Sequence, residues 1–213
     1  MGISGTVGSQ RENVGASTPD RLRTPATVPW FEFNSSVVAD GLRSRYSPEV
    51  AYFYHSLGFM AQYFHQDQKF RPASTSSVSI DVPANGYQCL ISYFLTGEER
   101  TSYSAPVIPK RDFDLRSPLQ HSGAVEIVAR VSRLHVGRQA LNPDTAAQLT
   151  DPAKFSPGAT EMTLGVNWYW NAWVRWQFNW ERAWFDEPVQ LGTENSGLLQ
   201  QQDSLFLRCQ VIF

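Results

Sequence analysis

The chain lacks any long hydrophobic run: no stretch reaches the roughly 18 consecutive apolar residues that indicate a transmembrane helix. Charge is also scarce, because only 18% of the 213 residues are charged, against about 25% in an average soluble protein. The 18 basic and 20 acidic side chains give a net charge of −2, without the excess of Lys and Arg that binds nucleic-acid phosphates. The composition therefore excludes a transmembrane helix and argues against a nucleic-acid-binding protein.

Cysteine is rare, and the sequence contains none of the usual catalytic or metal-binding motifs. Cys89 and Cys209 lie far apart, each on the apolar side of an alternating segment, so we expect two small apolar residues and no disulfide. The four histidines do not form the H-x-x-H or H-E-x-x-H spacing of a metal site, and no G-x-S-x-G nucleophile motif occurs. We therefore predict that the protein is not an enzyme and uses no metal and no cofactor.

Aromatic residues, by contrast, make up 13% of the chain, and apolar and polar residues alternate over long stretches. Alternation with a period of two predicts β-strands. The clearest strands are expected at 161–170, 174–185 and 204–213, with others at 28–34, 49–54, 59–64, 86–96 and 124–134. Residues 1–27 are rich in Gly, Ser, Thr and Pro and are predicted to be a flexible segment. The pattern predicts an all-β protein with about eight antiparallel strands.

The predicted connections between these strands differ in length. Tight turns are expected at Leu57-Gly58 and at 171–173, and long polar loops at 35–47, 70–80, 135–160 and 186–203. Short turns on one side and long loops on the other are typical of an outer-membrane β-barrel. Segment 97–123 does not fit this alternation, because it is long although it falls on the short-turn side.

Alternation alone is compatible with two folds. A soluble β-sandwich, for example a carbohydrate-binding protein, turns its apolar face inward, whereas a membrane β-barrel turns that face outward to lipid. The predicted strands are about 10 residues long, close to the roughly 9–11 residues of a tilted membrane-spanning strand and above the ~5–6 residues typical of soluble sheets. Strand length therefore favours an antiparallel up-and-down transmembrane β-barrel.

The ends of the strands also favour a membrane. Indole rings are stabilised at the membrane interface, and the tryptophans expected there are Trp170, Trp173 and Trp184. Apolar residues occupy every second position at the C-terminus, which is typical of the signal that the outer-membrane assembly machinery recognises. These positions are Leu205, Leu207, Cys209, Val211 and Phe213.

The polar side of each predicted strand would line a water-filled lumen. Between 174 and 181 we expect the apolar residues on the convex, lipid-facing side of a curved sheet and the polar residues on the concave side. The charged candidates for lining the channel are Glu49, Glu126, Arg130, Glu161, Arg175, Glu181 and Arg208. Arginine suits phosphate because its planar guanidinium donates two parallel hydrogen bonds. Acids and bases are nearly balanced, so the favoured alternative is that these arginines pair with the glutamates across strands.

Five segments, in order along the chain, resemble the phosphate-selective porin O/P family. They are SPEVAYFYHSLGFMAQYFHQD at 47–67, GYQCLISYFLTGEERTSY at 86–103, GAVEIVARVSRLHV at 123–136, TLGVNWYWNAWVRWQFNWERAWFD at 163–186, and the terminal strand at 205–213. Together they cover most of residues 28–213, which are accordingly identified as the porin β-barrel region.

The resemblance implies a trimeric, roughly sixteen-stranded channel in the outer membrane of a Gram-negative bacterium, through which small anions such as phosphate diffuse passively. The chain would then be the C-terminal half of such a barrel, and therefore truncated. The implied partners are outer-membrane lipid, small anions, the barrel assembly machinery and, at full length, two further copies in a homotrimer. The family's phosphate-selecting basic residues lie largely in the other half, so none of them is carried over to this sequence.

Overall fold

The computed structural model describes residues 1–11, 21–72, 79–142, 148–190 and 197–211. Its elements are β1 (Gly2–Arg11), β2 (Leu22–Arg23), β3 (Pro29–Phe31), β4 (Val37–Tyr54), β5 (Leu57–Pro72), β6 (Ile80–Phe94), β7 (Ala124–Val136), the 3-10 helix η1 (Arg138–Leu141), β8 (Gly158–Tyr169), β9 (Val174–Gln190) and β10 (Leu198–Val211). Within these ranges, no helix is long and apolar enough to cross a membrane.

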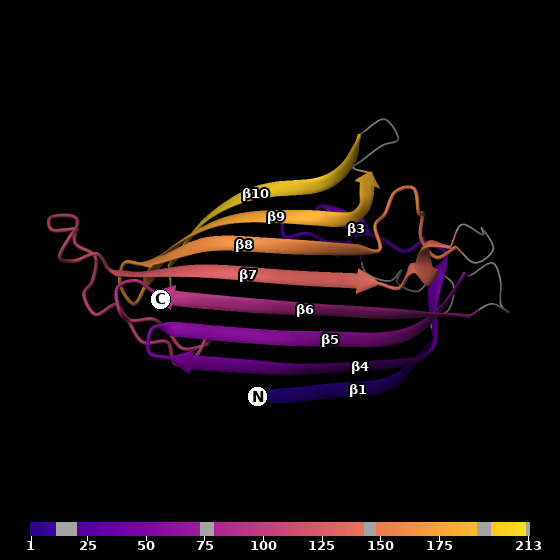
Figure 1. The fold of residues 1–213 in the computed structure, drawn as a ribbon, viewed down its shortest axis with the longest axis horizontal. Helices are drawn as coiled ribbons and strands as arrows, with labels where there is room; N and C mark the ends of the chain where they lie inside the picture. The colour runs from indigo at the N-terminus through magenta and orange to yellow at the C-terminus, as the bar shows by residue number, and fades with distance from the viewer. Residues whose placement is uncertain (12–20, 73–78, 143–147, 191–196, 212–213) are drawn as a thin grey trace.

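Eight strands form one antiparallel sheet in the order β1-β4-β5-β6-β7-β8-β9-β10, and β2 pairs with β3 in a separate two-stranded ribbon (Figure 1). Each sheet strand lies beside its neighbour along the chain, apart from the ribbon between β1 and β4, so the topology is up-and-down. The sheet is open, because no pairing joins β1 to β10 among the described residues. The prediction of an all-β protein with an eight-stranded antiparallel sheet is confirmed.

We call the two ends of the sheet the turn end and the loop end. The turn end, on the left in Figure 1, carries the short turns β4–β5 and β8–β9 together with the long connection 95–123. The loop end, on the right, carries the connections β1–β4, β5–β6, β7–β8 and β9–β10. At the turn between β8 and β9, the Asn171 side-chain oxygen accepts hydrogen bonds from the backbone N–H groups of Trp173 and Val174, both at 2.9 Å. This turn was predicted, whereas the β4–β5 turn lies at His55-Ser56, where His55 has φ 49°, and not at Leu57-Gly58.

The first strand of the sheet differs from the sequence expectation. Residues 2–11, expected within the flexible segment 1–27, form β1 and pair with β4 from Gly2↔Glu49 to Arg11↔Asp40. The strand expected at 28–34 is reduced to β3, outside the main sheet. Composition was misleading here because Gly and Ser weaken strand propensity, while pairing with β4 supplies a complete hydrogen-bond ladder.

Most of the segment 35–47, expected as a loop, belongs to the 18-residue strand β4, which begins at Val37. Gly41 has φ +118°, and the pairing of β4 with β5 shifts between Ala39 and Arg43. Such a bulge adds a residue to one strand and interrupts the regular in-out alternation. The sequence pattern was therefore broken at a point where the strand itself continues.

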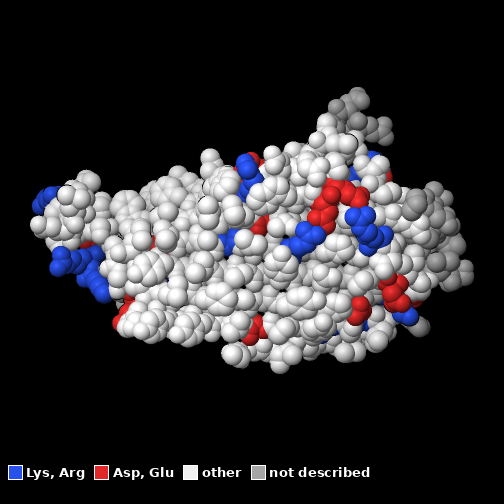
Figure 2. All heavy atoms as spheres, in the orientation of Figure 1, with Lys and Arg blue, Asp and Glu red and all other residues white. Residues whose placement is uncertain are grey.

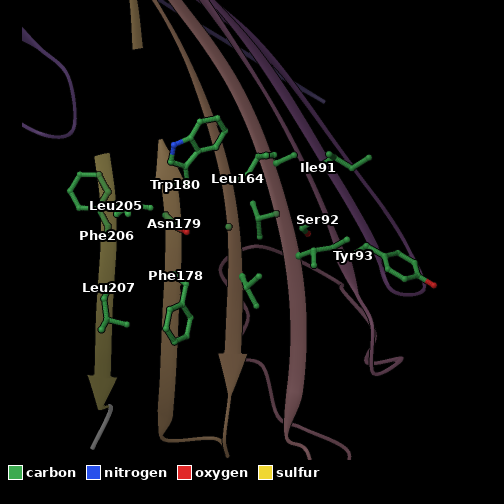
Figure 3. Close-up of a pocket in the computed structure, with 15 residues that line it drawn as sticks. Ile91, Ser92, Tyr93, Leu164, Phe178, Asn179, Trp180, Leu205, Phe206 and Leu207 are labelled. Carbon is green, nitrogen blue, oxygen red and sulfur yellow. The ribbon is translucent and has the colours of Figure 1, made fainter. Parts of the chain in front are cut away.

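The two sides of the sheet differ in chemistry, and we call them the apolar face and the polar face. On the apolar face, paired residues form two rows across β6 to β10: Tyr93, Ile127, Val166, Phe178 and Leu207, and Ile91, Ala129, Leu164, Trp180 and Leu205 (Figure 3). Most of these side chains are exposed, up to 82% for Leu205. Within the described ranges no second sheet covers this face, so the sandwich alternative finds no support.

The apolar face is hollowed where these two rows cross the sheet. The hollow has a volume of about 750 Å³ and is lined by all ten residues of the two rows, together with the five residues that lie between them along the strands. We expected a convex surface at this position. Twisted barrel sheets are saddle-shaped along the strands, and Ala129 is small between Ile91 and Leu164.

The buried core lies on the polar face at the loop end. Trp30 and Phe31 of the ribbon pack there against residues of six sheet strands and of the β7–β8 connection, among them Val82, Phe185 and Leu149. In Figure 1 the ribbon strand β3 lies behind the sheet. A smaller core at the turn end consists of Phe94, Ala124 and Tyr169. A single-layer sheet thus acquires its core from connections folded onto one face.

Candidate channel-lining face

The centre of the polar face carries a charged cluster that spans three strands. Arg130 on β7 donates from Nη2 to Glu161 Oε1 on β8 at 2.6 Å and to Thr163 Oγ1 at 3.2 Å. Glu181 Oε1 on β9 lies 3.8 Å from the same nitrogen. Adjacent strands place these side chains opposite one another, and the pairs match the expectation of cross-strand pairing.

Glu126 is enclosed at the turn end. Only 1% of the residue is exposed, and its carboxylate accepts hydrogen bonds from Asn167 Nδ2 at 3.0 Å and Tyr169 Oη at 3.1 Å. Its ionic partner is Arg100 of the connection 95–123, whose side chain is 6% exposed. Burial acts to lower the pKa of Arg100, but the charge and hydrogen bond of Glu126 outweigh this effect and raise it. This buried ion pair fixes the connection to β7.

Arg175 and Arg208 have no acidic partner among the described residues. Arg175 on β9 donates to Gln210 Oε1 at 2.6 Å, and its guanidinium lies 5.5 Å from the centre of the Tyr169 ring. Arg208 on β10 is exposed. The cross-strand pairing with glutamates expected for these two arginines is absent here, so the turn end of the polar face retains uncompensated positive charge. Glu49 is exposed on β4, opposite Gly2 of the edge strand.

Two further arginines lie on this face, outside the set of residues expected from the sequence. Arg43 and Arg45 lie on β4 in the same alternation as Glu49, and Arg45 donates to Gln66 Oε1 at 2.6 Å. Neither makes an ion pair with a described residue. They were overlooked because 35–47 was expected to be a loop, and the bulge removed the alternation that would have placed them on the polar side.

The long connection 95–123 folds over the strand ends at the turn end of the sheet. Near its start, the Arg100 backbone N–H donates to His55 O at 2.7 Å, and the Arg100 side chain reaches Glu126 on the polar face. Further along, the Phe113 N–H donates to Trp170 O at 2.7 Å, and its ring packs against Trp168 at a centroid distance of 4.9 Å. The segment whose length did not fit the strand pattern is therefore an ordered cover that contacts both faces.

Aromatic residues form two bands on the apolar face. At the turn end of this face Trp170 stacks on Phe113 at 5.1 Å and lies 5.8 Å from Trp176. Trp173 is not part of this band, because it lies in the β8–β9 turn, where it is 59% exposed. Trp184 lies toward the loop end of β9, in line with exposed tyrosines of β5 and β6. Trp176 and Trp184 are eight residues apart, which corresponds to about 27 Å of strand. A strand tilt of about 35–45° turns this length into a height of about 19–22 Å, close to the roughly 25 Å apolar band that lies between the aromatic girdles of an outer-membrane barrel.

The terminal ladder is also on the apolar face. Leu205, Leu207 and Val211 are exposed there, and Cys209 pairs with Trp176 in the same alternation. Both cysteines are free. Phe213 lies outside the described residues.

Comparison with known proteins identifies the family of this chain. The profile of the family described as phosphate-selective porin O and P matches residues 28–213. The chain belongs to this family. A search of curated proteins found no match. Porins of this family are outer-membrane channel proteins and form no enzyme family, which agrees with the location and fold expected from the sequence. The match begins at Val28, so β1 and β2 of this porin lie outside it.

Two arginines on the apolar face of this porin are paired with aspartates. Arg182, which interrupts the apolar alternation of β9, donates from Nε and Nη2 to the two carboxylate oxygens of Asp203 on β10, both at 2.8 Å. Trp180 Nε1 donates to the same carboxylate at 3.0 Å. Closer to the loop end, Arg133 pairs with Asp186 at 2.8 Å. Figure 2 shows this distribution: the visible face is mostly uncharged, with charged side chains gathered toward the loop end and at the tip of the connection.

Proposed function

We propose that this porin forms part of the wall of a water-filled channel through which small anions, phosphate among them, diffuse passively. The observation that carries the proposal is the contrast between the two faces of one open sheet. The apolar face is exposed and carries its charges in pairs, whereas the polar face carries four arginines without acidic partners among the described residues. Those four are Arg43, Arg45, Arg175 and Arg208.

The chemistry of the faces supports lipid on one side and water on the other. An unpaired Arg or Lys on the lipid face of a barrel costs about 2–4 kcal/mol at mid-membrane. Arg182 avoids this cost through Asp203. On the polar face the unpaired arginines need water or anions for solvation, and a wall with excess positive charge concentrates anions.

The open edges support a barrel that is completed by further strands. β1 and β10 each present a row of unpaired backbone groups, and every such group left in hydrocarbon costs several kcal/mol. Eight strands closed on themselves would leave an interior filled by side chains, and small residues on the polar face, such as Gly165 and Ser204, would not fill it. We infer that the chain supplies eight of roughly sixteen strands, and that the completed barrel forms homotrimers.

The channel proposal is tested by electrical recording. The complete barrel, including the further strands that close it, is extracted from outer membranes in mild detergent. It is then reconstituted in a planar bilayer under a salt gradient. We expect a reversal potential that indicates anion selectivity, and a reduction of chloride current when phosphate is added. Selectivity for cations would contradict the proposal. The chain refolded alone should give no uniform currents, and stable unitary currents from it would contradict the half-barrel inference.

We also propose that the apolar ladder from Leu205 to Phe213 is recognised by the barrel assembly machinery in the outer membrane. The exposed side chains of Leu205 and Leu207 on the edge strand β10 support this proposal. Deletion of Phe213 should block membrane insertion, measured as loss of the heat-modifiable band on a gel. Deletion of Met1 serves as the control, and equal insertion of the two variants would contradict the proposal.

A further inference from the structure

A second cavity lies on the polar side of the turn end, between the long connection and the β8–β9 turn. Its volume is about 300 Å³. One wall consists of Arg100 and residues 103–107 of the connection, and the other of Tyr169 and residues 171–175. This size is at the lower end of the range of small-molecule sites, roughly 300–1,000 Å³. The cavity exists only because the connection folds back onto the sheet.

Two arginines line this cavity, and each has a buried donor without a partner. Arg100 uses Nη2 for Glu126 and Nη1 for Ser102 O at 3.3 Å, and its Nε has no hydrogen-bond acceptor. Arg175 uses Nη2 for Gln210, and its Nε is likewise buried without an acceptor. Buried donors are rarely left unpaired in proteins, and an exception calls for a water, an ion or a ligand that satisfies it.

The charge balance around the cavity is positive. Arg100 is neutralised by Glu126, whereas no described acidic side chain pairs with Arg175. A cation would be repelled, and a neutral solute would leave the charge of Arg175 uncompensated in a partly buried site. An oxyanion satisfies both the charge and the unpaired N–H groups, because guanidinium donors match its oxygens in a fixed planar geometry.

Both arginines are held in position before any ligand arrives. The Arg100 guanidinium lies 4.8 Å from the centre of the Phe94 ring and 5.3 Å from that of Tyr103. Arg175 lies over Tyr169 and is also held by Gln210. Donors that are already oriented lose little conformational entropy on binding.

We propose that this cavity is a binding site for a small oxyanion, such as inorganic phosphate, at the turn end of the lumen. A role of this site in transient binding of permeating ions rests on the proposed function. Binding of an oxyanion to the cavity does not depend on that function. Trp173 lines the cavity and provides a reporter within the chain.

The test is a titration of the detergent-extracted porin with inorganic phosphate, followed by tryptophan fluorescence. We expect a saturable change that the Trp173→Phe variant lacks. Arg175→Gln should weaken phosphate binding at least about tenfold, the smallest effect expected for a lost charge-assisted hydrogen bond. Arg175→Lys should restore part of the affinity. Arg138→Gln makes the same chemical change at the exposed loop end and should bind as the wild type does.

A second variant removes the cavity and leaves both arginines in place. Ala172 lines the cavity, and Ala172→Phe should fill it and also abolish the saturable change. Heat-modifiable gel mobility checks that each variant is assembled. Equal phosphate affinity in wild type, Arg175→Gln and Ala172→Phe would overturn the proposal, as would a linear change that chloride reproduces at the same ionic strength. Binding without anion current contradicts the proposed function alone, and anion current without saturable binding contradicts this inference alone.

Discussion

The two ends of the polar face are both covered by connections, but different forces hold the covers. At the loop end, apolar side chains such as Phe31 and Leu149 are completely buried against the sheet. At the turn end, the cover is fixed by the buried ion pair between Arg100 and Glu126 and by backbone hydrogen bonds to the sheet edge.

The difference shows how each cover depends on its sequence. Apolar packing is not directional and tolerates exchange of side chains of similar volume. A buried ion pair requires both partners, because removing one leaves an uncompensated charge in a medium of low polarity. Conservative substitutions at the loop end should therefore change the free energy of unfolding only slightly. At the turn end, a single substitution in the ion pair should cause a large loss of stability.

The largest effect is expected for Arg100→Ala. The substitution leaves the buried Glu126 without its ionic partner, which should lower the free energy of unfolding by about 3–5 kcal/mol. Urea titration of the porin in detergent measures this loss, and protease cleavage within 97–123 should accelerate in parallel. Unchanged cleavage would show that the pair does not fix the connection.

Leu149→Ala is the corresponding change at the loop end. Leu149 is fully buried, and truncation of such a residue costs about 2–5 kcal/mol, depending on how far the site collapses. The same titration measures it, with Leu149→Met as the matched control, which should cost less than about 1.5 kcal/mol. A larger loss for Leu149→Met than for Leu149→Ala would contradict apolar packing as the force at this end.

A smaller effect is expected where the connection rejoins β7. Gly123 has φ +70°, and a Cβ atom there would collide with the Tyr169 carbonyl oxygen. Gly123→Ala should therefore destabilise the turn end by roughly 1–3 kcal/mol, the cost of a residue held in a strained conformation. Faster hydrogen exchange at Phe113 N–H, without a change at the loop end, is the expected local signature.

The smallest effect is expected for Arg138→Ala. Arg138 pairs with Glu187 at 3.0 Å, but its side chain is 70% exposed. Exposed pairs contribute about 0–1 kcal/mol because water and salt screen them. A loss comparable to that of Arg100→Ala would mean that burial does not distinguish the two ends.

Alternation by itself determined most of the sheet. Along β8, β9 and β10, successive side chains point to opposite faces, so the period of two assigned Phe178 and Glu181 to their sides without knowledge of the fold. Asn171 likewise marked the β8–β9 turn, because its side chain caps the turn backbone locally.

Contacts between distant residues decided the rest. β1 forms because its backbone groups hydrogen-bond with those of β4. Arg43 lies on the polar face because the strand continues beyond the bulge at Gly41 with a shifted register. Glu126 was recognised as a polar-face acid, but its partner Arg100 lies 26 positions earlier in a segment without any periodic pattern. Local patterns encode which way a side chain points, whereas the identity of its partner depends on how the connections fold back, which only the tertiary structure determines.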